Sequence, residues 1–238
     1  MNLTLLFSSS LKALGDEVKT AYKYYMAKKS VFGERELIEN LPSSIRTQLV
    51  MAAYEVDIQK LTYLKNEDTA YVCFLMLSMR PFNCLPQEVL LEQNDIADEI
   101  IFLLRGTVHL IRRGEDIDEA ACELVEDPNN FPFDETTPCL VGMVTEGGFF
   151  GDLGYRKKAP RVASYESQNI CQMLSVSRQE MDHANHMYAL SGKHFMKETQ
   201  SRLEVFEKAL ASSIIMLGSG RLSKNHIFVD GVLVDSSR

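Results

Sequence analysis

The spacing of apolar residues predicts helices in the first part of the chain. Between Leu11 and Leu64, apolar side chains recur every three or four residues, which is the period of an amphipathic helix. The clearest segment is 41–61, LPSSIRTQLVMAAYEVDIQKL, where Pro42 suits the first turn because proline has no amide hydrogen to lose there. One face of this helix carries Ile45, Leu49, Ala52 and Val56. We expect that face to pack on another element, with 16–32 and 33–42 completing a set of helical hairpins.

The pattern changes after residues 77–86, where apolar residues begin to alternate or run continuously, as is typical of strands. A first strand is predicted at Val89–Glu92, followed by a polar turn from Asn94 to Asp98. Two further strands follow, separated by Gly106. Strands resume in 139–152, 161–167 and 169–177. Short strands with turn signals between them predict an antiparallel roll or sandwich.

The last part of the chain is helical again, in segments 177–190 and 192–214. One face of the second segment carries Met196, Thr199, Leu203, Phe206 and Leu210. Such a stripe usually packs on a core, and here it could also close over a pocket. The predicted fold class is α+β: an antiparallel β-roll, jelly-roll-like, with flanking helices and preceding helical hairpins. The predicted domains are a helical region 1–68, the roll with its closing helices 69–217, and a tail 218–238.

An acidic, proline-containing segment from Gly114 to Pro138 interrupts the strands. It could dock a basic partner, although a solvated insertion between two strands is the favoured interpretation. The whole chain is acidic, with a formal net charge of -8, which disfavours a general role in nucleic-acid binding because such proteins cluster Lys and Arg against phosphates.

Five cysteines are scattered without a CxxC pair, so reduced, buried thiols are favoured over a disulfide framework or a zinc site. No stretch approaches the roughly 20 apolar residues of a membrane-spanning helix. The opening segment is a poor signal peptide because it lacks a basic leader and a long apolar run. These features predict a soluble chain.

Catalytic patterns are weak. His183 and His186 lie one helical turn apart beside Asp182, which could in principle hold a metal. Surface histidines are the favoured interpretation because no further ligand is matched to them. No GxSxG, P-loop or kinase glycine motif is present. We therefore expect neither an enzyme nor a metal site.

The segment 149–167, FFGDLGYRKKAPRVASYES, carries the strongest candidate chemistry. It sets a glycine and a carboxylate before a loop that ends in an arginine beside alanine. An arginine can pair with a small anion, and a carboxylate can accept a hydrogen bond from a sugar hydroxyl. The segment therefore favours a site for an anion that carries a sugar.

These residues resemble the phosphate-binding cassette of the cyclic-nucleotide-binding domains, Phe-Gly-Glu-(Ile/Leu), a loop, then Arg-(Thr/Ser)-Ala. The matching positions are Phe150, Gly151, Asp152 and Leu153, then Arg161, Val162 and Ala163. Earlier family motifs are also present, at Leu85, Pro86, Asp98, Glu99, Phe102, Gly106 and Val108. The resemblance covers about two-thirds of the chain.

The resemblance implies a role for each position. Arg161 would pair with the cyclic phosphate, Asp152 would accept from the ribose 2'-hydroxyl, and backbone amides from Asp152 to Gly154 and at Ala163 would donate to phosphate. The purine pocket would be lined by Val108, Val144, Leu203 and Phe206. Because Val162 replaces Thr or Ser, cAMP is favoured over cGMP. No other cofactor is expected.

The cassette also leaves a nucleotide-insensitive domain open. Ether-à-go-go-type potassium channels share Phe-Gly-Asp and are commonly insensitive to cyclic nucleotides, but they usually lack the cassette arginine, which is present here as Arg161.

Residues 36–64 are similar to the C-linker of cyclic-nucleotide-gated, hyperpolarisation-activated and voltage-gated potassium channels. The match rests on Leu37, Leu41, Pro42, Ile45, Arg46 and Leu49. It implies a homo- or hetero-tetramer formed through these helices, on the cytosolic face of a membrane, with a pore domain outside this sequence. The predicted function is a cAMP-binding gating module of a tetrameric cation channel, with potassium the favoured ion. The alternatives are a nucleotide-insensitive roll for channel assembly or gating, and a free soluble cAMP-binding regulatory protein.

Overall fold

The structure, a computed structural model, describes residue 38 and residues 40–112, 139–155, 160–218, 226–229 and 232–235. The predicted helix at 16–32 and the acidic segment 114–138 lie outside the described residues, as does Leu37 of the C-linker match. Within the described part, no helix is both long enough and apolar enough to cross a membrane.

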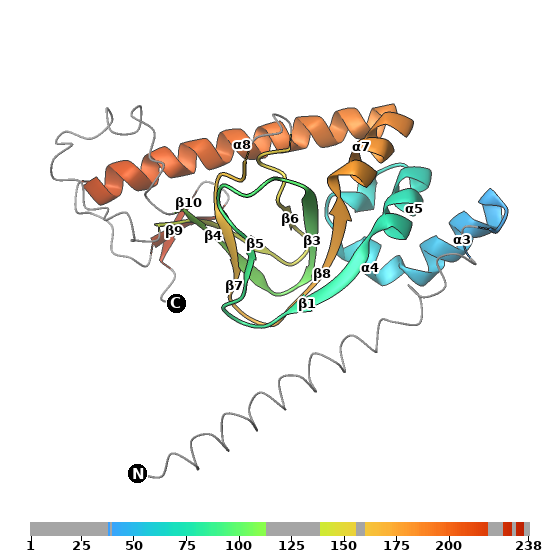
Figure 1. Cartoon of the computed structure of the whole chain (residues 1–238), viewed down its shortest axis with the longest axis horizontal. Helices are drawn as coiled ribbons and strands as arrows, with labels where there is room; N and C mark the ends of the chain where they lie inside the picture. Colours follow the sequence, from blue (N-terminus) through green and yellow to red (C-terminus); the bar gives the residue numbers. More distant parts are fainter. Residues whose placement is uncertain are drawn as a thin grey trace, which may run out of the picture.

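Two four-stranded antiparallel sheets form a roll in the centre of the molecule (Figure 1). One sheet has the order β1-β8-β3-β6 and the other the order β2-β7-β4-β5. The strands are β1 (Arg80–Cys84), β2 (Val89–Leu91), β3 (Glu99–Arg105), β4 (Thr107–Arg112), β5 (Cys139–Thr145), β6 (Phe149–Phe150), β7 (Ser164–Ser167) and β8 (Cys171–Ser177). The predicted α+β class with an antiparallel β-roll is confirmed.

The predicted strand on each side of Gly106 is present as β3 and β4, and Gly106 itself has φ 110°, a left-handed conformation that suits glycine. Strand β1 was not predicted. Its sequence RPFNC contains a proline and has no clear alternation, so it carries little strand signal. It pairs with β8 at the edge of its sheet, where a proline can be tolerated.

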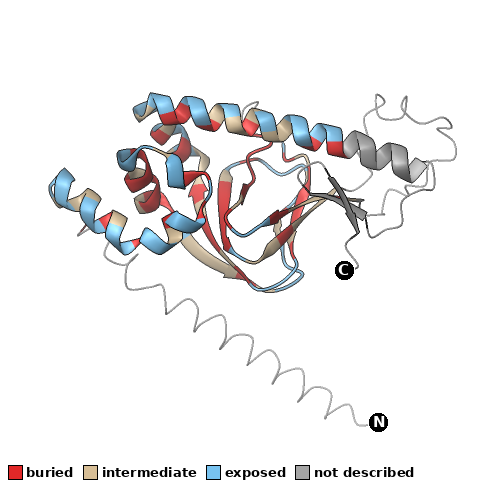
Figure 2. Ribbon diagram, turned by 180° about the vertical axis from the view of Figure 1, so that it is seen from behind, coloured by how far each residue is buried: buried red, intermediate tan, exposed pale blue. Residues whose placement is uncertain are grey.

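Helices cover one side of the roll. They are α3 (Ser43–Ala53), α4 (Glu55–Lys60), the 3₁₀ turn η1 (Leu64–Asn66), α5 (Thr69–Ser78), α7 (Arg178–Met187) and α8 (Ala189–Gly218). Buried residues of these helices and of β3 and β8 form one apolar cluster, and Figure 2 shows their buried sides turned inward. A second cluster fills the space between the two sheets and includes Leu103, Phe150 and Tyr165.

The predicted buried face of segment 41–61 is wrong. Ile45, Leu49 and Val56 are 52%, 43% and 70% exposed, and Ala52 is exposed too. The helix breaks at Tyr54, which is both the C-cap residue of α3 and the N-cap residue of α4.

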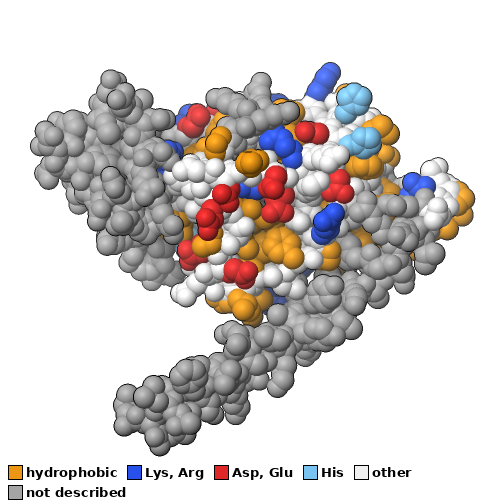
Figure 3. Space-filling view, viewed as in Figure 1, with side chains coloured by type: hydrophobic (Ala, Val, Ile, Leu, Met, Phe, Trp, Pro, Cys, Tyr) orange, Lys and Arg blue, Asp and Glu red, His pale blue; other side chains and the backbone are white. Residues whose placement is uncertain are grey.

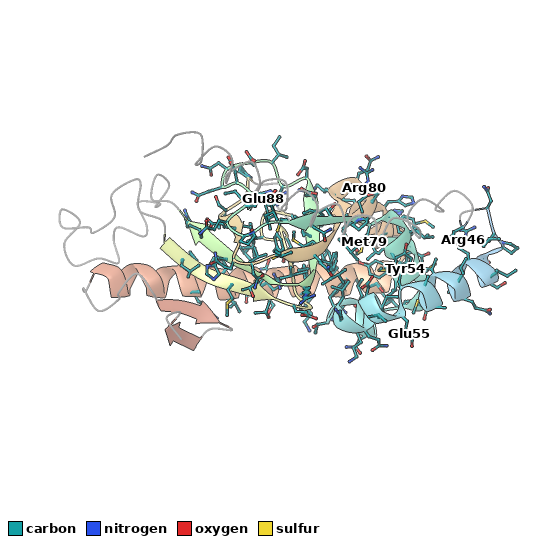
Figure 4. The ribbon with its side chains drawn as sticks, turned by 90° about the horizontal axis from the view of Figure 1, so that it is seen from below. Arg46, Tyr54, Glu55, Met79, Arg80 and Glu88 are labelled. Atoms are coloured by element: carbon teal, nitrogen blue, oxygen red, sulfur yellow. The ribbon has the colours of Figure 1, made fainter. Side chains whose placement is uncertain are left out.

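The buried residues of this segment are instead Val50, Tyr54, Ile58 and Leu61. They lie four and three residues apart, so they satisfy the helical period as well as the predicted set does. Tyr54 has the largest side chain of these four residues. Figure 4 shows it with Met79 where the helices meet the roll. Pro42 stands at the cap position before the first turn of α3.

Two helix starts have the side-chain caps that their sequences suggest. Asp68 accepts from the amides of Ala70 at 2.9 Å and Tyr71 at 3.2 Å, which fixes the start of α5. Ser177 and Glu180 form a capping box that starts α7 directly at the end of β8. From there the chain enters α8, whose 30 residues span about 45 Å and cross the roll beside β5 (Figure 1).

Acidic side chains gather on the face of the roll shown in Figure 3. This agrees with the formal net charge of -8. Among the residues that the structure describes, no three His, Cys, Asp or Glu side chains gather as a metal site would require.

Candidate functional site

The cassette loop begins at a glycine that the backbone requires. Gly151 follows β6 with φ 88°, and a Cβ there would lie 2.8 Å from the Glu99 carbonyl oxygen and 3.0 Å from Nη1 of Arg161. A side chain at this position would therefore meet both strain and atoms of the site. The next residues form a turn in which the Tyr155 amide donates to the Asp152 carbonyl at 2.9 Å.

Arg161 is buried beneath this loop and only 4% exposed. Its guanidinium donates to the carbonyl oxygens of Gly151 and Glu99, each at 3.4 Å, and its Nη2 lies 3.2 Å from Oδ1 of Asp98. The Asp98 side chain is 76% exposed. Arg161 is thus a buried cation whose carboxylate partner stands in water, where an ion pair is weak.

The backbone on either side of Arg161 fixes its position. Its amide donates to the Asp95 carbonyl at 2.8 Å, and its carbonyl accepts from the Asn94 amide at 2.9 Å. Burial raises the pKa of the neighbouring Glu99 carboxyl, Asp98 acts in the same direction, and Arg161 opposes both. The cassette arginine is therefore held by the turn between β2 and β3.

Asp152, the predicted ribose-binding carboxylate, is fully buried and already paired. Oδ2 lies 3.0 Å from Nε of Arg202 on α8, and Oδ1 accepts from Nη2 of Arg202 at 3.4 Å. Arg202 also donates to the Phe149 carbonyl at 2.5 Å and lies over the Phe149 ring, 4.2 Å from its centre. This two-point pairing joins the cassette loop to the closing helix.

The electrostatics of the pair follow from its burial. Burial raises the pKa of the Asp152 carboxyl, and Arg202 opposes that shift. Burial would lower the pKa of Arg202, but its acidic neighbours, with Asp152 foremost and Tyr165 and Glu198 adding to it, outweigh burial and raise that pKa. Each charge is therefore stabilised mainly by the other.

Sequence reasoning missed Arg202. The signal was present, because Arg202 lies three residues after Thr199 and four before Phe206, on the same side of the helix as the apolar stripe. A charge at such a position calls for a buried partner. Nothing local to α8 shows that the partner is Asp152.

A cavity of about 430 Å³ lies between β5 and α8, next to this pair. It is lined by Leu110, Val141, Gly142, Met143, Val144, Thr145, Gly148, Leu153, Glu198, Ser201, Arg202, Val205, Phe206 and Ala209. Its volume suits a small organic ligand.

The structure brings some predicted site residues to this cavity and leaves others elsewhere. Val144, Leu153 and Phe206 line it, while Leu203 and Val162 pack beside Leu153 and the buried Ala163. Two others lie in the core between the sheets: Val108 is fully buried there, and Phe150 stacks on Tyr165 with 4.9 Å between ring centres. Asp152 and Arg161 are both buried and do not line the cavity, but the Arg202 partner of Asp152 does.

The paired histidines of α7 do not form a site. The His183 ring contacts Phe74, with 5.4 Å between ring centres. Both histidines stay outside any three-residue group of possible ligands in the described part of the chain.

Comparison with known proteins gives the family context. No protein-family model matches the chain. It is similar to potassium channel KOR1 of Oryza sativa subsp. japonica, at 18% identity over 193 residues that cover 80% of this chain and 20% of the relative. Potassium channel SKOR of Arabidopsis thaliana matches at 18% identity over 191 residues, covering 78% of this chain and 21% of the relative. The chain thus spans about a fifth of the length of these channels.

The fold is also similar to that of a solved structure, cAMP-bound PfPKA-R (141-441). The TM-score is 0.52 at 16% identity, and the match covers 72% of this chain and 51% of that one. The matched proteins are channels and a regulatory domain rather than catalytic domains. The chain has the fold of the cyclic-nucleotide-binding domains and is similar in sequence to plant potassium channels.

Proposed function

We propose that this chain is the cyclic-nucleotide-binding gating module of a potassium channel, and that it takes cAMP in preference to cGMP. The observation that carries the proposal is the placement of Arg161 and Asp152. The buried Arg161 donates to the carbonyl of Gly151, and the next residue, the buried Asp152, pairs with Arg202, which lines the cavity beside α8. Burying both charges is costly unless something uses or pairs them.

The cyclic phosphate would replace Asp98 as the partner of Arg161. Asp98 is largely exposed, so its carboxylate can move into water at little cost, whereas the guanidinium stays fixed by the Gly151 and Glu99 carbonyls. A phosphate offers two oxygens to the guanidinium, which is the stronger arrangement. The amides that follow Gly151 lie in the adjacent turn and supply further donors.

The ribose hydroxyl would compete with Arg202 for Asp152. Any ligand that donates a hydrogen bond to this carboxylate changes the contact between the cassette loop and α8. A ligand shifts an equilibrium only by its difference in affinity for the two states, and this contact is where such a difference would arise. Ligand binding would in this way alter the contact that holds the closing helix α8 on the cassette loop.

The base would lie among Val141, Leu153 and Phe206 in the cavity. Val162 stands where a hydroxyl residue would be needed to bind the guanine or phosphate side of cGMP. The absence of that hydroxyl supports a preference for cAMP.

Assembly into a tetramer through the N-terminal helices is part of the proposal. Ile45, Leu49 and Val56 form an exposed apolar face on α3 and α4. Exposed apolar patches on helices mark sites of contact with other chains. Together with the similarity to potassium channels, this supports a module on the cytosolic side of a membrane, joined to a pore outside this sequence.

A nucleotide-insensitive roll is the second candidate. It is favoured by the internal pairing of both charges, Asp152 with Arg202 and Arg161 with Asp98. In that case Arg202 would serve in place of a ligand and hold α8 permanently on the roll.

Calorimetric titration of the chain with cAMP and with cGMP distinguishes the two candidates. Saturable binding is expected, and Arg161→Ala should weaken it about ten- to hundred-fold, since a charge-assisted contact contributes about 1.5 to 3 kcal/mol. Arg80→Ala, which removes an exposed arginine of β1 far from the cassette loop in sequence, is the matched control and should leave affinity unchanged. No heat with either nucleotide at millimolar concentration, in a chain shown to be folded by circular dichroism, would establish the insensitive roll.

A further inference from the structure

Two buried thiols lie directly opposite each other on paired strands. The antiparallel register of β1 and β8 sets Cys84 against Cys171, and both side chains are buried. Both cysteines are reduced. Residues opposite each other in an antiparallel pair have Cα atoms about 4.5 to 5.5 Å apart, within the range that a disulfide spans.

A second cavity lies next to the residues that flank Cys171. This cavity, of about 610 Å³, is lined by three residues next to the cysteine in sequence, three at the junction of β3 and β4, and two from other turns: Asn169, Ile170 and Gln172; Arg105, Gly106 and Thr107; Pro86 and Glu146. A Cβ at Gly106 would lie 2.5 Å from Sγ of Cys171. Because glycine has none, no side chain at position 106 separates the sulfur from this polar cavity.

The two thiols also differ chemically. The Cys84 thiol hydrogen-bonds to the Cys171 sulfur and lowers the pKa of Cys171 to about 7, against the opposing effect of burial. The same hydrogen bond and burial raise the pKa of Cys84. A thiolate is the nucleophilic form of cysteine, so Cys171 is the attacking partner and Cys84 the resolving one.

We propose that Cys84 and Cys171 form a reversible redox pair, which hydrogen peroxide converts to a disulfide that joins β1 to β8. The Cys171 thiolate attacks one peroxide oxygen, the O–O bond breaks, and hydroxide leaves, which makes a sulfenic acid on Cys171. The Cys84 sulfur then attacks this sulfur, the S–O bond breaks, and the leaving oxygen departs as water with the Cys84 proton. In total two thiols lose two electrons and two protons, and one peroxide becomes two waters.

The position of the pair gives the disulfide a structural effect. Strand β1 is an edge strand that continues from α5, and β8 runs directly into α7 and α8. The bond would therefore fasten the strand that follows the N-terminal helices to the strand that precedes the closing helices. It would also close a long loop that contains the whole cassette, which restricts the unfolded chain.

The test uses the full chain with Cys122→Ser and Cys139→Ser, so that Cys73, Cys84 and Cys171 are the only cysteines counted. The reduced chain is treated with graded hydrogen peroxide, blocked with N-ethylmaleimide in denaturant, digested, and mapped by mass spectrometry. The expected product is a crosslinked Cys84–Cys171 peptide that dithiothreitol reverses. Cys73, a buried cysteine on α5 whose pKa is raised chiefly by burial, is the internal control and should stay labelled by the maleimide.

Two further readouts keep the proposal falsifiable. In Cys84→Ser, Cys171 should stop at the sulfenic acid and be trapped by dimedone, and the rise in melting temperature that oxidation produces in the parent chain should be absent. The proposal is overturned if Cys84 and Cys171 both stay labelled at peroxide concentrations that consume free glutathione. It is equally overturned if Cys73 oxidises as fast as Cys171, or if the crosslink forms only in denaturant.

Discussion

Arg202 of α8 pairs with the buried carboxylate of Asp152 at 3.0 Å, across fifty residues of sequence. The contact ties the closing helix to the loop that carries the cassette glycine and, through that loop, to Arg161. Movement of α8 and occupation of Asp152 are therefore linked, whatever ligand the cavity takes.

Removing the cation should destabilise the fold. Arg202→Leu leaves Asp152 buried and unpaired, and the free energy of unfolding should fall by about 3 kcal/mol, as when one member of a buried pair is removed. Urea unfolding measures the change. Lys197→Leu, which removes an exposed cation from the same helix, should change stability by less than about 0.5 kcal/mol.

A double-mutant cycle separates pairing from packing. Asp152→Asn combined with Arg202→Leu should recover part of the loss, because no buried charge is then left alone. Equal stabilities of Arg202→Leu and Lys197→Leu would show that the pair contributes nothing.

The loss in Arg202→Leu should depend on pH. Burial raises the pKa of Asp152 and Arg202 opposes this, so without Arg202 the pKa in the folded state rises further. A carboxyl with a raised folded-state pKa keeps its proton longer in the native than in the unfolded chain, so the native state is disfavoured as pH rises from the unfolded pKa to the folded one. The difference in stability between the parent chain and Arg202→Leu should be larger at pH 8 than at pH 5.

Urea unfolding at several pH values checks this, and Asp152→Asn/Arg202→Leu is the control. The difference in stability between that double variant and the parent chain should be nearly constant over the pH range in which Asp152 titrates in Arg202→Leu. A difference for Arg202→Leu that grows as pH falls would contradict the assignment to Asp152.

Gly151→Ala should be strongly destabilising. Its φ of 88° disfavours any side chain, and the new Cβ would lie 2.8 Å from the Glu99 carbonyl oxygen. Such backbone strain contributes on the order of 1–3 kcal/mol before the steric contact is added. Thermal unfolding measures the change, and a variant as stable as the parent would mean that the loop adopts another conformation.

Asp98→Asn should tighten nucleotide binding. The exposed Asp98 carboxylate competes with the cyclic phosphate for Arg161, so its neutralisation should lower the dissociation constant several-fold while stability changes by less than about 1 kcal/mol. Asp95→Asn, which neutralises a neighbouring carboxylate in the same turn, is the matched control. Calorimetric titration with cAMP gives the result, and weaker binding in Asp98→Asn would contradict the competition.

The sequence by itself determined the local elements and the family resemblance. Apolar alternation, turn residues and caps act over a few neighbouring residues, so the strands on both sides of Gly106, the α7 start at Ser177 and the cassette turn at Gly151 could be predicted. The antiparallel roll followed from those elements, because short strands with tight turns have few other ways to bury their apolar faces.

Only the tertiary structure decided which faces and charges meet. Ile45, Leu49 and Val56 have the helical period, yet Val50, Tyr54 and Ile58 are buried, because the break at Tyr54 and the packing surface beneath it select between two equally periodic faces. The contacts of Asp152 with Arg202 and of Cys84 with Cys171 join residues far apart in sequence. Such pairings leave no periodic trace along the chain, since they depend on strand register and on the path of α8 across the roll.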